Sequence, residues 1–188
     1  MGKTILVIDS CHTTMFVGLF DDESGMYDNY LLHHGRRDFD KNINRLVRKI
    51  LEKNKILFKD LAAYAVVTGP GSWTGCRVGV SATLGFALGT PRPIIELNSL
   101  DIIAYPHGED VALHCYANQY YTLKDGVYAF GEIDNINDYT TMEPYVDEEY
   151  RQNLESMVSG KFANKEFIEP EALKPNYIAE FEPNKKRN

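Results

Sequence analysis

One short turn combines residue types and a spacing that could do chemistry. The apolar run 62–67 predicts a buried strand, which cannot continue through the glycine–proline–glycine sequence that follows it. Ser72 and Thr74 then offer hydroxyl caps for a helix expected from about residue 76 to residue 88. A turn from strand to helix points backbone N–H groups at one spot, which suits an anion or a closely packed partner. The turn consists of Gly69, Pro70, Gly71, Ser72, Trp73, Thr74 and Gly75, and Arg77 follows it in the helix.

The spacing of this turn excludes the common phosphate-binding motifs. A Walker A loop ends in Gly-Lys followed by Ser or Thr, and that ending is missing. Gly69, Gly71 and Gly75 are not spaced as in the dinucleotide-binding fingerprint. Ser72 or Thr74 could act as a nucleophile only with a base within hydrogen-bond reach, and there is no Gly-x-Ser-x-Gly elbow. We therefore interpret both hydroxyls as helix caps.

The histidines and cysteines do not form a metal-binding pattern. None of the five histidines has a second histidine four residues away, so no helical pair can share a metal ion. The three cysteines, Cys11, Cys76 and Cys115, are far apart, and the chain has no Cys-x-x-Cys pair. This pattern favours a reducing cytoplasm and argues against a disulfide framework. We expect no metal site.

The composition is that of an acidic, globular chain. Its 188 residues are enough for one core or two small lobes, and its formal net charge is −7. Residues 109–188 contain 8 Lys or Arg against 16 Asp or Glu, so the second half is a poor surface for a nucleic-acid backbone. No apolar run approaches the roughly 20 residues that span a bilayer, and we recognise no leader peptide. We expect a cytoplasmic protein without membrane contact.

Hydrophobic periodicity predicts an α/β protein in two parts. Residues 1–108 indicate three strands, then helix, strand, helix, strand and helix, which is the order of a ribonuclease-H-like lobe. Residues 109–188 indicate a reduced second lobe, with three short strands, a helix and an irregular, loose tail. The expected strands are 3–8, 14–20, 26–33, 62–67, 93–97, 111–116, 119–124 and 127–132, and the expected helices are 39–54, 76–88, 99–105 and 145–159.

Two of these helices have faces that could pack on the protein's own sheet or on a second polypeptide. In the helix 39–54 the apolar residues follow the spacing i, i+3, i+4, i+7. In the helix after the turn, one face carries mostly small residues, which let another backbone approach closely. The sequence leaves both alternatives open. The residues concerned are Ile43, Leu46, Val47 and Ile50 on the first helix, and Gly75, Gly79, Ala82 and Phe86 on the second.

Three segments resemble the TsaB (YeaZ) family. The segment that begins at Gly69 is similar to that family's signature Gly-Pro-Gly-Ser-Phe-Thr-Gly-Leu-Arg-Ile-Gly, with Trp73 in place of phenylalanine. Residues 5–10 resemble the family's opening Ile-Leu-Ala-Ile-Asp-Thr-Ser, and residues 93–100 resemble the strand and helix start that follow the signature. The resemblance implies an actin-like, two-lobed fold with a complete first lobe and a reduced second lobe.

Asp9 ends the first expected strand. In the actin-like superfamily this position holds a carboxylate near the nucleotide phosphates and their metal ion. The alternative for Asp9 is an Asx turn between two hairpin strands. Residues 9–14 contain neither glycine nor lysine, so we expect no catalytic role for this carboxylate without positioned partners.

The resemblance also implies a non-catalytic function. Members of the family pair with the catalytic subunit TsaD through a bundle of first-lobe helices. Together with the ATPase TsaE, the pair serves threonylcarbamoyl transfer to adenosine 37 of tRNA, which forms t6A. The two helical faces described above would form the interface, and the turn 69–75 with Arg77 would lie close to the partner or to a bound nucleotide.

The same resemblance sets the expected cofactors and partners. The chain alone needs no cofactor, and ATP or ADP could lie at the interface of the complex. The complex would bring it to tRNA, and the chain alone could form a homodimer. Two other functions stay open: an autonomous ATPase or kinase that uses Asp9 and the glycine turn, and a metallopeptidase, which the missing histidine pair disfavours.

Overall fold

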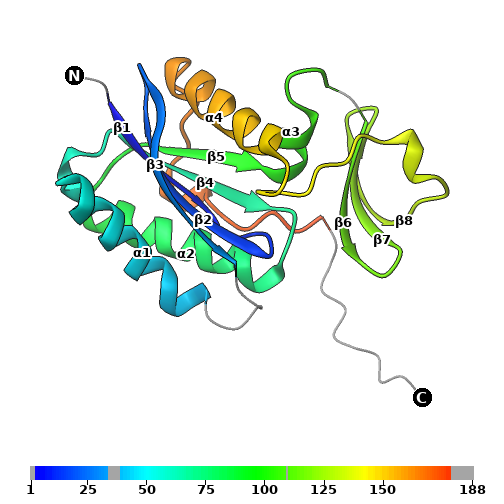
Figure 1. The fold of residues 1–188 in the computed structure, drawn as a ribbon, viewed down its shortest axis with the longest axis horizontal. Coiled ribbons are helices and arrows are strands. Elements are labelled where there is room, and N and C mark those ends of the chain that lie inside the picture. The colour runs from blue at the N-terminus through cyan, green and yellow to red at the C-terminus, as the bar shows by residue number, and fades with distance from the viewer. Residues whose placement is uncertain (1–2, 34–38, 109, 179–188) are drawn as a thin grey trace.

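A five-stranded sheet forms the centre of the molecule, and helices cover both of its faces (Figure 1). The computed structural model describes residues 3–33, 39–108 and 110–178. The sheet consists of β1 (Thr4–Asp9), β2 (Thr14–Asp21), β3 (Gly25–His33), β4 (Ala63–Gly69) and β5 (Ile94–Asn98). A smaller sheet consists of β6 (Val111–Tyr116), β7 (Gln119–Lys124) and β8 (Val127–Glu132). The helices are α1 (Phe39–Asn54), α2 (Trp73–Gly89), α3 (Ser99–Ala104) and α4 (Glu148–Ala163).

The larger sheet mixes antiparallel and parallel pairing. Its strand order is β3-β2-β1-β4-β5, with antiparallel pairs β1–β2 and β2–β3 and parallel pairs β1–β4 and β4–β5. Parallel neighbours need a crossover connection, which α1 and α2 provide. This is the topology of a ribonuclease-H-like lobe. The element order predicted from the periodicity is confirmed.

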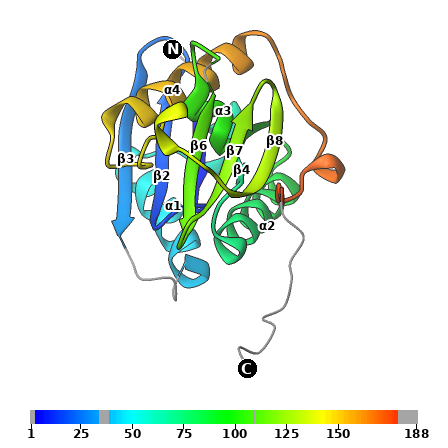
Figure 2. The ribbon, with the colours of Figure 1, turned by 90° about the vertical axis from the view of Figure 1, so that its right-hand side faces the viewer.

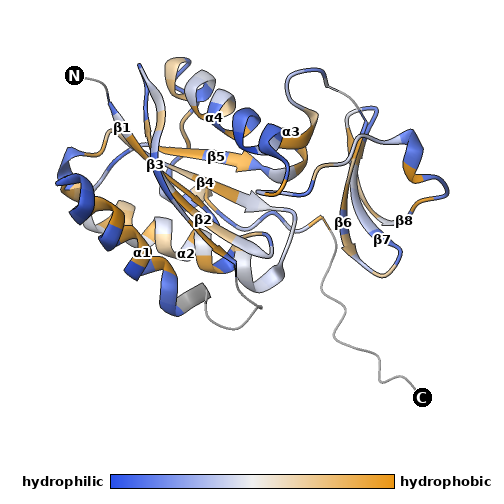
Figure 3. Ribbon diagram, viewed as in Figure 1, coloured by the Kyte–Doolittle hydropathy of each residue, from blue (hydrophilic) through white to orange (hydrophobic). Residues whose placement is uncertain are grey.

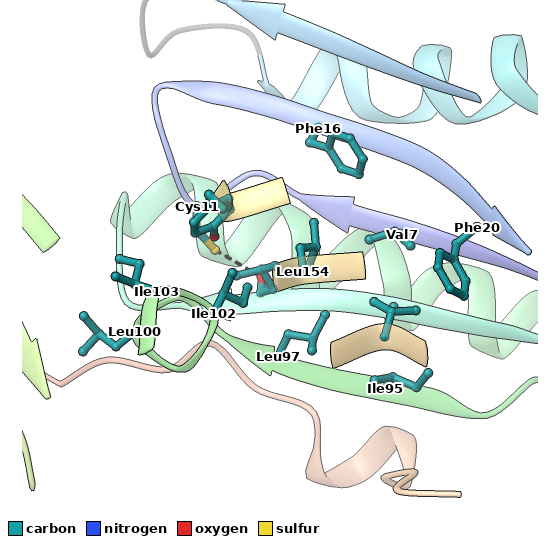
Figure 4. Close-up of a cluster of buried hydrophobic side chains, with 14 of the residues drawn as sticks. Val7, Cys11, Phe16, Phe20, Ile95, Leu97, Leu100, Ile102, Ile103 and Leu154 are labelled. Atoms are coloured by element: carbon teal, nitrogen blue, oxygen red, sulfur yellow. Dashed lines mark hydrogen bonds between the residues drawn. The ribbon is translucent and has the colours of Figure 1, made fainter. Parts of the chain in front are cut away.

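Side chains of β1 alternate between two apolar cores, one on each face of the sheet. Ile5 and Val7 belong to the core under α3 and α4, whereas Leu6 and Ile8 belong to the core under α1 and α2. Figure 4 shows part of the first core, in which Val7, Leu97 and Leu154 come together from β1, β5 and α4. Figure 3 shows α1 with an apolar inner side and a polar outer side, as its periodicity predicts.

The smaller sheet is an antiparallel meander at one end of the molecule (Figure 1), the end that faces the viewer in Figure 2. Asp125 and Gly126 join β7 to β8, and both have positive φ angles, +49° and +78°. Positive φ at both central residues gives the turn a twist that matches the strands it joins. The Asp-Gly hairpin predicted from the sequence is confirmed.

The second half of the chain forms the smaller sheet and also packs a helix, α4, on the larger sheet. Tyr150, Leu154 and Val158 of α4 are fully buried, and they share a core with β1, β4 and β5 of the larger sheet. The two sheets lie on opposite sides of residue 108 in the sequence, and apolar side chains of both belong to one cluster. The division into two lobes at residue 108 stays a prediction. Residues 165–178 contain no long helix, as expected, but a short 3₁₀ helix forms at Pro170–Ala172 and Ile168 bridges to Ile94 at the edge of β5, so this part of the chain is not loose. The rest of the expected tail, residues 179–188, lies outside the described residues.

No helix within the described ranges has both the length and the apolar character needed to cross a membrane.

Candidate functional site

Ser72 caps α2, as its residue type predicts. Its Oγ accepts a hydrogen bond from the Gly75 N–H at 3.3 Å, and the helix begins at Trp73 rather than near residue 76. Thr74 lies exposed inside the first helical turn, so the expected second cap is wrong. Arg77 is exposed one turn further along the helix.

The glycines of this turn let it pack on the backbone of the loop between β1 and β2. A Cβ atom at Gly71 would lie 2.2 Å from the Cys11 carbonyl oxygen, and one at Gly75 would lie 1.9 Å from the Ser10 carbonyl oxygen. The Ser72 N–H donates to the same Cys11 oxygen at 2.6 Å. The backbone of the β1–β2 loop therefore fills the space beside the turn in which an anion could have bound.

The C-terminal segment closes the other side of the turn (Figure 2). The Asn176 N–H donates to the Thr68 carbonyl oxygen at 2.9 Å, and the Tyr177 ring stacks on Trp73 with ring centroids 3.7 Å apart. Gly69 has a φ of +122°, and a Cβ there would lie 2.8 Å from the Asn176 carbonyl oxygen. Both the backbone conformation and the lack of space require glycine at this position.

The two helical faces singled out by the sequence pack on the protein's own sheet. The buried residues of α1 and α2 among them are Ile43, Leu46, Val47, Ile50, Gly75 and Gly79. A Cβ at Gly79 would lie 2.7 Å from the Ser10 Oγ, and Ala82 and Phe86 pack half-buried against the same core. Six of these eight positions are thus covered by the protein's own sheet, whereas Ala82 and Phe86 keep part of their surface open. The interface itself stays a prediction.

Asp9 is fully buried, and hydroxyl and amide donors occupy both of its carboxylate oxygens. Its Oδ1 accepts a hydrogen bond from the Cys11 N–H at 2.8 Å, which is the Asx turn considered from the sequence. Its Oδ2 accepts hydrogen bonds from the Tyr145 hydroxyl at 2.7 Å and the Tyr150 hydroxyl at 3.2 Å. Tyr145 also stacks on Phe16, with ring centroids 5.0 Å apart. The second half of the chain thus closes over the carboxylate that the sequence singled out as a possible metal ligand.

His12 brings a serine and this carboxylate together, but not in the arrangement of a hydrolase. Its Nε2 lies 3.4 Å from the Ser99 Oγ and 3.5 Å from the Asp9 Oδ2. A catalytic triad needs the serine and the carboxylate on opposite nitrogens of the imidazole. Here both face Nε2, which also lies 3.0 Å from the Tyr150 hydroxyl. His12 therefore cannot act as the general base of a triad, because that role needs Ser99 at one ring nitrogen and the Asp9 carboxylate at the other.

Burial fixes the protonation of this cluster. Burial lowers the pKa of His12 below its ordinary value, although the nearby Asp9 carboxylate acts in the opposite direction. Burial and the Asp9 charge raise the pKa of the Tyr145 and Tyr150 hydroxyls well above the usual range. Both tyrosines are therefore permanent donors at neutral pH, and the imidazole is neutral.

The possible nucleophiles near Asp9 are also engaged. The Ser10 hydroxyl donates to the Gly75 carbonyl oxygen at 2.8 Å, and the Cys11 Sγ lies 3.1 Å from the Val67 carbonyl oxygen (Figure 4). Burial and the neighbouring Cys76 raise the pKa of the Cys11 thiol well above its usual range, so the thiolate needed for reaction does not form at neutral pH.

This region does not fit the phosphates of a nucleotide. The oxygens of Asp9 and the Ser72 N–H are already engaged. The polar pocket at the carboxyl ends of β4 and β5, about 270 Å³ in volume, is lined by two carboxylates, Glu96 and Asp101, and by one cation, Lys161, which is paired with Glu166. The net negative charge of this lining opposes a phosphate. In the part of the chain that the structure describes, no three His, Cys, Asp or Glu side chains are grouped so that they could hold a metal ion.

The residues that complete this cluster were missed by sequence reasoning. Tyr145 and Tyr150 are 136 and 141 residues from Asp9 in the chain, and Ser99 is 87 residues from His12. No local pattern marks a tyrosine as the donor to a distant carboxylate. The only available signal was the expected position of a helix after residue 145, which the ribonuclease-H-like topology brings back over the sheet.

Known proteins similar in sequence to this chain belong to one family. A family model described as TsaD, tRNA N6-adenosine threonylcarbamoyltransferase, matches residues 34–136, more than half of the chain. The TsaB protein of Escherichia coli is 32% identical over 100 residues, and the TsaB protein of Buchnera aphidicola is 27% identical over 201 residues. The chain belongs to this family, within its TsaB (YeaZ) group.

The extent of these matches differs between the relatives. The Escherichia coli match covers 53% of this chain and 42% of that protein, so the chain spans less than half the length of that relative. The Buchnera aphidicola match covers 99% of this chain and 86% of that protein. YeaZ from Pseudomonas aeruginosa, a solved structure, superimposes with a TM-score of 0.66 at 19% identity, covering 93% of this chain and 99% of the other. The α/β, actin-like fold expected for the TsaB (YeaZ) group is confirmed.

Proposed function

We propose that this chain is a non-catalytic subunit that binds and activates a TsaD-like subunit for threonylcarbamoyl transfer to adenosine 37 of tRNA. The observation that carries the proposal is that both carboxylate oxygens of Asp9 already accept hydrogen bonds within the chain. At the strand end where an actin-like enzyme needs a free carboxylate, two tyrosine hydroxyls from the second half of the chain occupy its oxygen. The names of the matching family model and of the relatives supply the reaction that such a subunit would serve.

The outer face of α2 is the best candidate for the contact with the catalytic subunit. Leu88 is 78% exposed, the largest exposed fraction of any large hydrophobic side chain among the described residues. Gly85 and Gly89 beside it are exposed, and a Cβ at either would meet nothing within 4 Å. Small residues around an exposed leucine let a helix of another protein approach closely and cover the leucine. Ser81 continues the same face.

The rest of the assembly follows from the same proposal. A TsaE-like ATPase would join the pair in the cytoplasm, and tRNA would bind through the complex. Because the residues around Asp9 do not fit a nucleotide, ATP or ADP at the interface would take its main contacts from the partner. Without the catalytic subunit, the exposed α2 face would pair with a second copy of this chain.

Co-purification with the TsaD-like subunit of the same genome tests the proposal. The two proteins should elute as one species, and threonylcarbamoyl transfer to tRNA should be lost when this chain is omitted and restored when it is added. Leu88→Asp should abolish both pairing and transfer, because it places a charge in a contact that excludes water.

Val127→Asp is the matched control. Val127 is 64% exposed on β8 of the smaller sheet, so the same substitution changes the surface charge equally without touching α2. It should leave pairing and transfer unchanged. The proposal fails if no pair forms and the chain alone turns over Mg-ATP, which is the behaviour of an autonomous ATPase.

A further inference from the structure

A second cavity lies at the opposite end of the sheet from Asp9, and the site described above does not use it. Its volume is about 410 Å³, and it lies at the amino ends of β1, β4 and β5, under the last turn of α4 (Figure 1). Concave sites of roughly 300–1,000 Å³ are the usual size for small ligands. The lining includes the charged residues Lys3, Asp22 and Lys165 and the aromatic residues Phe162 and Phe167.

Two lysines give the rim of this cavity a positive charge. Lys3 and Lys165 are both exposed, and neither ammonium group makes an ion pair with any residue that the structure describes. The one carboxylate in the lining is Asp22, and its Oδ1 accepts a hydrogen bond from the Lys3 backbone N–H at 2.5 Å. With two cations and one carboxylate, the lining has a net positive charge and favours binding of an anion. The chain as a whole has a net charge of −7.

The floor of the cavity is aromatic. The rings of Phe162 and Phe167 are tilted against each other by 60°, with centroids 5.9 Å apart. The Lys3 Nζ lies over the Phe162 ring, 5.6 Å from its centroid, so this ammonium group is in direct contact with the apolar floor. A ligand that placed its charge at the rim would therefore place its body on these rings.

The turn that carries Lys165 is held in position. Lys165 has a φ of +57°, which is uncommon for a residue with a side chain. Its N–H donates to the Phe162 carbonyl oxygen at 3.2 Å, and the Ile168 N–H donates to the Ile94 carbonyl oxygen at 2.9 Å. The lysine and the aromatic floor are thus fixed relative to the edge of β5, which lowers the conformational entropy lost on binding.

We propose that this cavity binds a small organic anion with a flat apolar body, with the anionic group between Lys3 and Lys165 and the body on Phe162. A bare inorganic anion would leave the rings uncovered, and a neutral aromatic compound would leave both ammonium groups without a counter-charge. The site is independent of the proposed subunit function, because its lining includes no residue of α2 and none of the residues around Asp9.

Titration with 8-anilinonaphthalene-1-sulfonate tests the proposal, because this probe combines flat rings with one sulfonate. The full chain should show one saturable site by fluorescence, and the amide signals of Ala62, Ser159 and Ala163, which also line the cavity, should shift. Lys3→Met and Lys165→Met should each weaken binding by roughly two- to fivefold, the range of an exposed charge pair. Methionine keeps the length and apolar stem of each lysine.

Two controls separate this site from general apolar binding. Lys124→Met removes the same charge from the smaller sheet and should leave the affinity unchanged. N-phenyl-1-naphthylamine, the same rings without the sulfonate, should bind more weakly and be insensitive to both lysine substitutions. The proposal is wrong if the sulfonate probe does not saturate, if Lys124→Met weakens it as much as Lys3→Met does, or if the shifted amides lie elsewhere.

Discussion

A methyl group added at residue 75 should destabilise the fold, whereas the same group added at residue 85 should stabilise it. Both glycines lie in α2. A Cβ at Gly75 would lie 1.9 Å from the Ser10 carbonyl oxygen, less than the roughly 3.5 Å of an ordinary contact. The obstacle is backbone, so the loop between β1 and β2 must move away from the helix. A Cβ at Gly85 would meet nothing within 4 Å.

The expected magnitude for Gly75→Ala follows from three contributions. Overpacking typically costs about 1–3 kcal/mol, and a rigid backbone obstacle favours the upper end. Displacement of the loop also breaks the hydrogen bond from the Ser10 hydroxyl to the Gly75 carbonyl oxygen, which contributes about 1 kcal/mol. Alanine's better helix propensity offsets about 1 kcal/mol. The net loss should be about 3 kcal/mol, whereas Gly85→Ala retains only the propensity gain of about 0.5–1 kcal/mol.

Urea denaturation followed by circular dichroism measures both variants on the same scale. In a thermal scan the Gly75→Ala midpoint should fall by roughly 6–12 °C, because about 1 kcal/mol shifts the midpoint of a chain of this size by roughly 2–4 °C. The midpoint of Gly85→Ala should rise by a few degrees. If Gly75→Ala were as stable as the original chain, the turn would not rest on the Ser10 backbone as described.

Three further measurements test the buried cluster and the C-terminal segment. Because burial lowers the pKa of His12, the stability that its neutral imidazole contributes should be complete above about pH 6.5 and should be lost as the pH falls through the folded-state pKa. His12→Gln should therefore make the urea midpoint depend less on pH between about pH 7 and pH 5. Tyr145→Phe removes a donor from the fully buried Asp9 carboxylate and should cost about 1.5–3 kcal/mol. Tyr128→Phe, whose hydroxyl donates to the half-buried Asp101 carboxylate, should cost less than about 1 kcal/mol, and equal costs would contradict the burial of the cluster. Tyr177→Ala removes the stacked partner of Trp73, the only tryptophan, so its fluorescence should shift to the red and stability should fall by about 0.5–1.5 kcal/mol; an unchanged spectrum would show that the two rings are not stacked in solution.

The elements of this fold were predictable because each carries its own local signal. The alternating and continuous apolar runs mark the strands, and the spacing of Ile43, Leu46, Val47 and Ile50 marks α1. Ser72 marks the start of α2. The helix begins at Trp73, before its apolar pattern starts, because the residues of a first helical turn need no apolar face. Local signals of this kind do not depend on where the rest of the chain lies.

The assignment of α4 to the larger sheet was not predictable in the same way. Its apolar residues, including Leu154 and Val158, indicate a helix with one buried face, but periodicity does not say which sheet covers that face. The same ambiguity affected α1 and α2, whose apolar faces were equally compatible with a second polypeptide. Only the positions that remain exposed after the chain has folded, such as Leu88, can distinguish a core face from a contact face.

Asp9 illustrates why the fold position of a residue does not decide its chemistry. The β1–β2 hairpin places this carboxylate at the strand end where an actin-like enzyme needs it. Recruitment of a metal ion would require both tyrosine hydroxyls to leave, and each hydrogen bond to a charged group contributes about 1.5–3 kcal/mol. Since Tyr150 is fully buried in the core with α4, its departure would also expose apolar surface. The Asp9 carboxylate therefore links the two halves of the chain through hydrogen bonds, and binding of a metal ion there would break contacts that stabilise the fold.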